Sequence, residues 1–372
     1  MDLHAFLSGP ALDIQAEGRA QWGHHIQPLY RMAEIPSDLD LVILGCGEFR
    51  GQDASLSFSE GPDRIREEFY RLYNWHPDVK VGDLGNILPG QTLADTRAAL
   101  RTILAELRQM GLRVLVLGGS HDLTLQAYRV CCERDEIIDF TVIDMLADLD
   151  DRGGERYDNH LMEALTGTPN FVRHFTLMGF QSYYVNPHLI ETFDRLHFDC
   201  IRVGKAREDL EQMEPVLRGT HLLSIDLNAI RCGDAPANRL GSPNGFYGDE
   251  MCRLTRYAGM SQAMQSFGIY GYLPEYDRHG LTAKLMAQMI WYYIDGLYVQ
   301  KGESSLDDPQ QFMEYHITFT DHQTEFIKSK RTNRWWMKLP GGRFIPCTHK
   351  DYITACNNEI PERWMREVER LV

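Results

Sequence analysis

The chain has 372 residues, of which 43% are hydrophobic and 24% are charged, a composition typical of a folded globular protein. Its formal net charge of −15 argues against binding to nucleic acid or to an anionic membrane, because both attract basic protein surfaces. No apolar run approaches the roughly 20 residues needed to cross a bilayer. The N-terminal residues also lack the pattern of a signal peptide, so we expect a cytoplasmic protein.

Short apolar runs alternate with longer stretches of helical periodicity. The predicted strands are residues 41–45, 113–118, 140–144, 175–179, 222–226 and 267–270, with a weaker one near 200–203. The predicted helices are residues 62–73, 93–110, 123–134, 187–196, 207–217, 249–264 and 282–297. This alternation predicts right-handed crossovers and a mostly parallel sheet, and strands that are apolar throughout are typical of a sheet covered on both faces. We therefore expect a three-layer α-β-α fold.

The character of the sequence changes near Ser304. Residues 314–320, 335–339 and 343–345 are predicted strands, and the last two flank a Pro-Gly-Gly turn. Two tryptophans follow a locally basic segment, which could form a nucleic-acid patch. The acidity of the whole chain favours instead an appendage that packs its aromatic side chains on the core or on a neighbouring subunit. We thus predict an α/β domain at 1–303 and an appendage of strands, a hairpin and a short helix at 304–372.

Polar side chains follow three of the predicted strands. His121 comes directly after Gly118-Gly119-Ser120, Asp144 and Asp148 follow the next strand along the chain, and Asp226 ends a later one. Reactive groups of open parallel sheets collect at the carboxyl ends of the strands, so we expect these four to lie together. Each alone has a plain structural explanation, as a hydrogen-bonded turn histidine or a helix cap. Together, three buried carboxylates need a compensating cation, and a set of one histidine and three carboxylates suits Mn²⁺.

The order of these motifs resembles the ureohydrolase superfamily of arginases, agmatinases and formimidoylglutamases. The family motifs are Gly-Gly-Asp-His-Ser, Asp-Ala-His-x-Asp and Ser-x-Asp-x-Asp. Further matches lie at residues 61–66, 83–85, 179–182 and 274–283, so the resemblance covers about residues 40–300. Within the superfamily the sequence is most similar to bacterial formimidoylglutamase-like proteins. The resemblance implies a homo-oligomer that hydrolyses C–N bonds in a small linear amidine, such as formimidoylglutamate or a guanidino compound.

The resemblance also assigns metal ligands. One of the two family metal sites uses the positions of His121, Asp144, Asp148 and Asp226, and all four residues are retained. The second site adds two ligands, at positions occupied here by Leu146, which cannot bind a metal, and Asn228, a weak neutral ligand. The implied centre therefore holds one Mn²⁺ at most, or none.

Three other positions bear on catalysis. His160 falls where the family keeps a proton-shuttling histidine, so it is the candidate catalytic residue. The glutamate that binds the amidine in arginase-like members corresponds to a position near Gly271 in this sequence. Arg231 occupies a position that is acidic in the family. The Arg231 guanidinium could fold over the carboxylates and replace the cation. Three interpretations stay open: a divergent amidine hydrolase, a non-catalytic descendant with a binding, scaffolding or regulatory role, and a one-metal enzyme closer to the related zinc deacetylases.

Overall fold

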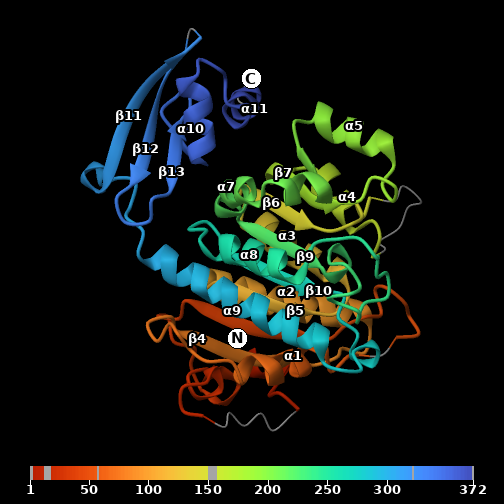
Figure 1. Ribbon diagram of the computed structural model, residues 1–372. Coiled ribbons are helices and arrows are strands. Elements are labelled where there is room, and N and C mark those ends of the chain that lie inside the picture. Colours follow the sequence, from red (N-terminus) through yellow and green to blue (C-terminus); the bar gives the residue numbers. More distant parts are fainter. Residues whose placement is uncertain (1–2, 12–17, 57, 150–156, 321, 371–372) are drawn as a thin grey trace.

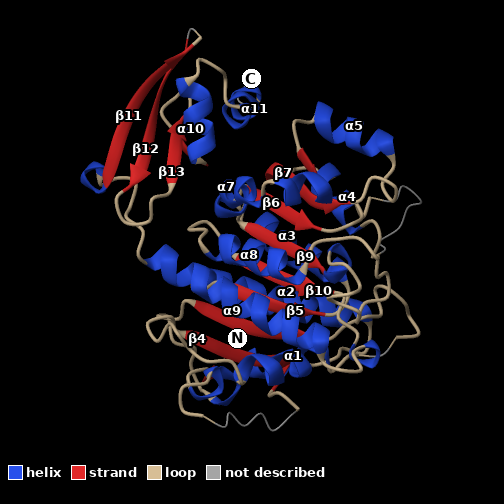
Figure 2. Cartoon of the chain, viewed as in Figure 1, coloured by secondary structure: helices blue, strands red, loops and turns tan. Residues whose placement is uncertain are grey.

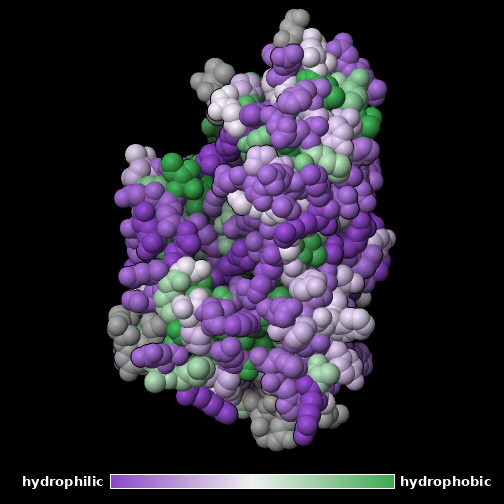
Figure 3. Space-filling model, turned by 90° about the vertical axis from the view of Figure 1, so that its left-hand side faces the viewer, coloured by the Kyte–Doolittle hydropathy of each residue, from purple (hydrophilic) through white to green (hydrophobic). Residues whose placement is uncertain are grey.

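The computed structural model describes residues 3–11, 18–56, 58–149, 157–320 and 322–370 (Figure 1). Within these ranges no helix has both the length and the apolar character needed to span a membrane. The face of the molecule in Figure 3 is mainly hydrophilic, with hydrophobic residues in small separate groups.

A large, mostly parallel sheet forms the centre of the molecule. In the described ranges it has ten strands, in the order β1-β4-β3-β5-β10-β9-β6-β7-β8, with β2 beside β4. Only β1 runs antiparallel to its neighbour there. The strands are β1 (Leu7–Ser8), β2 (Gln27–Pro28), β3 (Leu41–Cys46), β4 (Val81–Ile87), β5 (Val114–Gly118), β6 (Ile138–Ile143), β7 (Val172–Phe180), β8 (Asp199–Arg202), β9 (Leu222–Asp226) and β10 (Ser266–Tyr270).

Helices cover both faces of this sheet (Figure 2). They are α1 (Gly61–Tyr70), α2 (Leu93–Gln109), α3 (Thr124–Glu133), α4 (His160–Thr166), α5 (Pro187–Arg195), α6 (Val203–Glu208), α7 (Met213–Gly219), α8 (Gly248–Gly259) and α9 (Leu281–Lys301). Alternate residues of each strand point to opposite faces. Leu41 and Ile43 thus join a core with α1 and α6 to α9, whereas Val42 and Leu44 join a second core with α2 to α5. The expected three-layer α-β-α fold is confirmed.

Every predicted strand of the sheet is present, and β1, β2 and β4 are additional. The longest of these is β4. Its glycines and Asp83 lower its strand propensity. A tertiary contact compensates, because the buried Arg66 of α1 donates to both carboxylate oxygens of Asp83, from Nε (2.7 Å) and Nη2 (3.0 Å). Two of the matched motifs therefore serve to join α1 to the sheet. The predicted helix at 207–217 is wrong in detail, because the non-helical backbone of Asp209 (φ −148°, ψ 78°) ends α6, and a 3-10 turn at Leu210–Gln212 precedes α7.

The C-terminal segment forms a second, antiparallel sheet, β11-β12-β13-β14. Its elements are β11 (Phe312–Phe319), β12 (His322–Ser329), β13 (Trp335–Lys338), β14 (Phe344–Cys347), α10 (His349–Cys356) and α11 (Glu362–Glu369). β12 and one of the two helices are additional to the predicted elements. Trp335 joins an apolar core of this segment, whereas Trp336 stacks on the guanidinium of Arg218 in α7, 4.3 Å from its ring centre. The appendage thus packs on the core, while the boundary at residue 303 stays a prediction.

Candidate metal centre

Three strand ends, within four consecutive strands of the sheet, bring the predicted ligands together. The sheet order β5-β10-β9-β6 places the turn after β5, which carries His121, beside the end of β9 with Asp226 and the residues after β6. The end of β10, between β5 and β9, contributes Gly271. Its φ of +89° is left-handed, and a Cβ atom there would lie 3.0 Å from Asp226 Oδ1. Glycine at this position leaves space for the Asp226 carboxylate.

The three carboxylates converge on one ring nitrogen of His121. His121 Nδ1 lies 3.0 Å from Oδ2 of Asp144, 3.0 Å from Oδ2 of Asp148 and 3.6 Å from Oδ2 of Asp226. The Nδ1 hydrogen bond goes to Asp148, so Asp144 Oδ2 is buried without a hydrogen-bond partner. Asp148 adopts a left-handed φ of +43°, which is uncommon for a residue with a side chain and persists only where the surroundings enforce it.

The other ring nitrogen of His121 has a hydroxyl group as its hydrogen-bond partner. His121 Nε2 lies 2.7 Å from the hydroxyl oxygen of Ser224 on β9, and Ser224 in turn contacts the hydroxyl of Thr124. All three residues are buried. Metal-binding histidines commonly have such a partner, because it fixes the ring orientation and directs the free nitrogen toward the ion.

Electrostatics at the cluster favour a bound cation. Burial and the charge of Asp144 raise the pKa of Asp226 to about 8, and burial and the charge of Asp148 raise the pKa of Asp144. Burial alone would lower the pKa of His121, but its contacts with Asp144 and Asp148 outweigh burial and raise that pKa well above the usual value. The imidazolium thus offsets part of the negative charge. A divalent ion would offset more of it and would give the unpartnered Asp144 oxygen a ligand role, so the residues fit a metal.

His160 lies at the start of α4, beside the same cluster. Its ring centre is 4.7 Å from that of His121, and its Nδ1 is 2.8 Å from the Tyr157 carbonyl oxygen and 3.6 Å from Asp148 Oδ2. Burial and the positive charge of His121 lower the pKa of His160 to about 4, so the ring is neutral at pH 7. His121, Asp148 and His160 also form a second group whose ligand atoms lie within 4.8 Å of one another, beside the group of His121, Asp144 and Asp226. The sequence gave His160 a catalytic role and no indication that it could act as a metal ligand.

A small pocket opens onto the cluster. Besides cluster residues and Gly271, its walls include Gln52, Leu146, Tyr157, Asn228, Asn238, Arg239 and Leu240. Asn228 Oδ1 accepts a hydrogen bond from the Met145 amide (3.2 Å), so this side chain binds backbone. Gln52, Asn238 and Arg239 were not predicted, because they lie in loops without a recognisable pattern. Arg239 Nη1 donates to Asp53 Oδ2 at 2.9 Å.

Arg231 does not cover the carboxylates. Its guanidinium donates to both oxygens of Asp234, from Nε (2.9 Å) and Nη2 (2.8 Å), and stacks on the Tyr247 ring at 4.0 Å. The hypothesis that Arg231 replaces the cation is therefore wrong. A nearby acid and an aromatic ring, which the sequence could not place, hold the side chain elsewhere.

Known proteins resemble this chain in sequence and in fold. Residues 40–295 match the Arginase family. The formimidoylglutamase of Enterobacter sp. (strain 638) is 22% identical over 275 residues, which are 69% of this chain and 86% of that protein.

Solved structures extend the comparison. Formimidoylglutamase from Bacillus subtilis has a TM-score of 0.67 at 14% identity, with 80% of this chain and 98% of that chain covered. Formiminoglutamase from Trypanosoma cruzi, solved with Mn²⁺, has a TM-score of 0.63 at 16% identity, with 73% and 97% covered. At such identities the structural likeness concerns the fold. The family match spans most of the chain and ends before the appendage, and on that match the chain belongs to the arginase family.

Proposed function

We propose that the chain is a divergent metal-dependent hydrolase of C–N bonds in linear amidines, of the formimidoylglutamate or guanidino type. One divalent ion, Mn²⁺, would be held by His121, Asp144, Asp148 and Asp226. The observation that carries the proposal is the convergence of three carboxylate oxygens, those of Asp144 and Asp148 buried and that of Asp226 half-buried, within 3.0 to 3.6 Å of His121 Nδ1. Relatives named formimidoylglutamases, one of them solved with Mn²⁺, support the same class of reaction.

A single ion follows from the two altered positions. Leu146 adds an apolar wall to the pocket, and the Asn228 amide oxygen already accepts a backbone hydrogen bond. Neither side chain supplies the anionic or imidazole ligand that a second ion requires. We therefore expect one ion per chain and slower hydrolysis than in a complete two-metal enzyme, since the bridging position for water is lost.

The residues around the ion have separable roles. The bound ion would lower the pKa of water and polarise the amidine carbon. His160 Nδ1 donates to the Tyr157 carbonyl, so the lone pair of this neutral ring lies on Nε2, which is buried without a partner among the described residues. With the ion bound, His121 would be neutral and would no longer lower the His160 pKa, so that atom could accept the proton of the attacking water and return it to the leaving nitrogen. Asn238, at the pocket wall, would orient a substrate carboxylate, because its Nδ2 is buried without a partner among the described residues.

A second candidate function is a non-catalytic family member with a binding, scaffolding or regulatory role. The observation that favours it is the combination of Leu146 and Gly271 in the pocket wall, where neither offers a group that could grip an amidine. Loss of substrate positioning and of one metal activator would each raise the barrier by about 3 kcal/mol or more.

Metal analysis and a product assay test both candidates. We expect one Mn²⁺ per chain by calorimetry and mass spectrometry, and formamide release from formimidoylglutamate. Asp144→Asn should abolish both, whereas Asp139→Asn, at the opposite end of the same strand β6, should change neither. Two ions would overturn the ligand assignment. One ion without formamide or urea release would favour the non-catalytic candidate, and no ion would refute the metal-dependent hydrolase.

A further inference from the structure

A large cleft lies between the α/β sheet and the appendage. Its volume is about 800 Å³, within the usual range for small-molecule sites, and such sites occur preferentially where two structural units meet. On one side it is lined by the first residues of β6 and β7, by β8 and by α7, and on the other by β14, α10 and α11. Asp139 at the start of β6 lines the cleft, whereas Asp144 of the metal cluster follows the end of that strand. The cleft and the metal cluster therefore lie at opposite ends of the parallel strands.

Most cations in the cleft wall are already neutralised by a close carboxylate. Arg366 Nη1 donates to Asp199 Oδ1 at 2.7 Å, Arg370 Nη2 lies 3.1 Å from Asp199 Oδ2, and Arg343 Nη2 donates to Glu367 Oε2 at 2.9 Å. These pairs fix α11 against β8 and β14 and neutralise their guanidinium groups, although Arg370 Nη2 has no hydrogen bond in the described residues.

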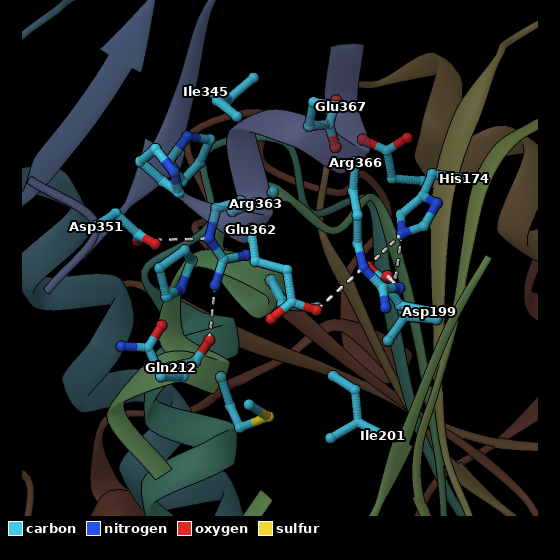
Figure 4. Close-up of a pocket in the computed structure, with 18 of the residues that line it drawn as sticks. His174, Asp199, Ile201, Gln212, Ile345, Asp351, Glu362, Arg363, Arg366 and Glu367 are labelled. Atoms are coloured by element: carbon cyan, nitrogen blue, oxygen red, sulfur yellow. Dashed lines mark hydrogen bonds and ion pairs between the residues drawn. The ribbon is translucent and has the colours of Figure 1, made fainter. Parts of the chain in front are cut away.

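Arg363 of α11 differs from these arginines in the longer distance to its carboxylate partner. Its Nη2 donates to the Gln212 carbonyl oxygen at 3.0 Å, but its Nε is 3.7 Å from Asp351 Oδ2, which is too far for a hydrogen bond. Asp351 Oδ2 already accepts from the backbone and hydroxyl of Thr348, as the cap of α10. The Arg363 Nε is consequently buried without a hydrogen-bond partner in the described residues. Figure 4 shows this guanidinium between Asp351 and Gln212 at the cavity.

Apolar side chains supply part of the cavity surface, beside the charged residues of its wall. Ile201 of β8 and Ile345 of β14 lie on different sides of the cavity in Figure 4, and Met213 of α7 adds a thioether to its lining. Glu362 also lines the cavity, and its carboxylate is 3.3 Å from Arg366 Nε. A cavity whose mixed lining places apolar walls beside an incompletely paired guanidinium fits a ligand that has an anionic head and an apolar body.

We propose that this cleft binds a small organic anion, a carboxylate or a phosphate monoester with an apolar body, and that Arg363 anchors its anionic head. The ligand would contact α7 and β8 of the core and α11 of the appendage at the same time. Its binding would therefore stabilise the packing of the two units, by an amount that rises with the logarithm of its concentration relative to its dissociation constant. This site is independent of the proposed hydrolysis.

Calorimetry on the full chain with three probes tests the proposal. Phenylacetate and phenyl phosphate carry the two kinds of anionic head, and phenylacetamide is the matched neutral compound. We expect at least one anion to bind with a dissociation constant below about 1 mM, and the amide to bind at least about 10-fold more weakly. The stronger of the two anions identifies the head group. Binding of neither anion, or equal binding of the amide, would overturn the proposal.

Variants then locate the site. Arg363→Gln keeps a donor for Gln212 and should weaken anion binding by about 10-fold or more. Ile201→Phe keeps every charge and should weaken binding by filling the cavity. Lys350→Gln is the control, because this lysine lines the same cleft but is exposed and pairs with Asp209 at 3.1 Å. It should change binding less than about twofold. Wild-type affinity in Arg363→Gln with an unchanged melting temperature would refute the anchor, and an equal loss in Lys350→Gln would indicate attraction to general positive charge only.

Discussion

Replacing Ser224 with alanine tests whether the His121 ring is held as a metal ligand. The Ser224 hydroxyl is fully buried and lies 2.7 Å from His121 Nε2. Without it the buried ring nitrogen loses its partner, which costs about 1 to 3 kcal/mol of stability. The ring also becomes free to rotate away from the carboxylates. Loss of such a partner lowers metal affinity by about 10- to 100-fold, which corresponds to roughly 1.4 to 2.7 kcal/mol.

The assay is a Mn²⁺ titration by calorimetry, together with the melting temperature of the metal-free protein. Ser261→Ala is the matched control, because Ser261 is also fully buried and donates its hydroxyl to the Thr220 carbonyl oxygen at 2.9 Å. We expect both variants to be less stable and only Ser224→Ala to bind Mn²⁺ more weakly. If Ser224→Ala retains wild-type affinity, or if Ser261→Ala loses as much, the reasoning that His121 is an oriented ligand is refuted.

Three other substitutions have distinct expected results. His160→Gln should lower the rate of formamide release by about 100-fold with unchanged Mn²⁺ affinity, measured by steady-state kinetics and calorimetry, whereas a ligand role for this histidine would lower both. The double variant Leu146→His and Asn228→Asp should bind two Mn²⁺ per chain by metal analysis, and a count of one would contradict the assignment of these positions. Asp199→Asn should destabilise the protein at pH 7 by on the order of 2 kcal/mol. Burial raises the pKa of Asp199, but the hydrogen bond from His174 and the arginines of α11 outweigh burial and lower it below the usual value. The Asp199 carboxylate therefore stabilises the fold fully above about pH 4, and this effect is lost as the pH falls further. The melting temperatures of variant and wild type should converge in acid. A difference that stays constant with pH would show that the ion pairing of Asp199 is not the cause.

The fold could be predicted from the sequence because its signals are local. An apolar strand such as β5 and the periodic apolar positions of α2 do not depend on distant residues, and both appear near the predicted bounds. β4 and α4 could not be predicted. β4 depends on the distant Arg66 to neutralise Asp83, and α4 has only seven residues.

For the candidate site, the sequence determined which residues stand at the strand ends, and parallel topology predicts that His121, Asp144 and Asp226 meet. Only the tertiary structure decided what surrounds them. It placed His160 against Asp148 and turned Arg231 toward Asp234, because those contacts depend on loop conformations with no repeating pattern. The cleft with its incompletely paired Arg363 likewise exists only because the appendage packs on β8 and α7. Strand ends follow from local periodicity, whereas the geometry of loops and of packed units is set by contacts between residues far apart in the chain.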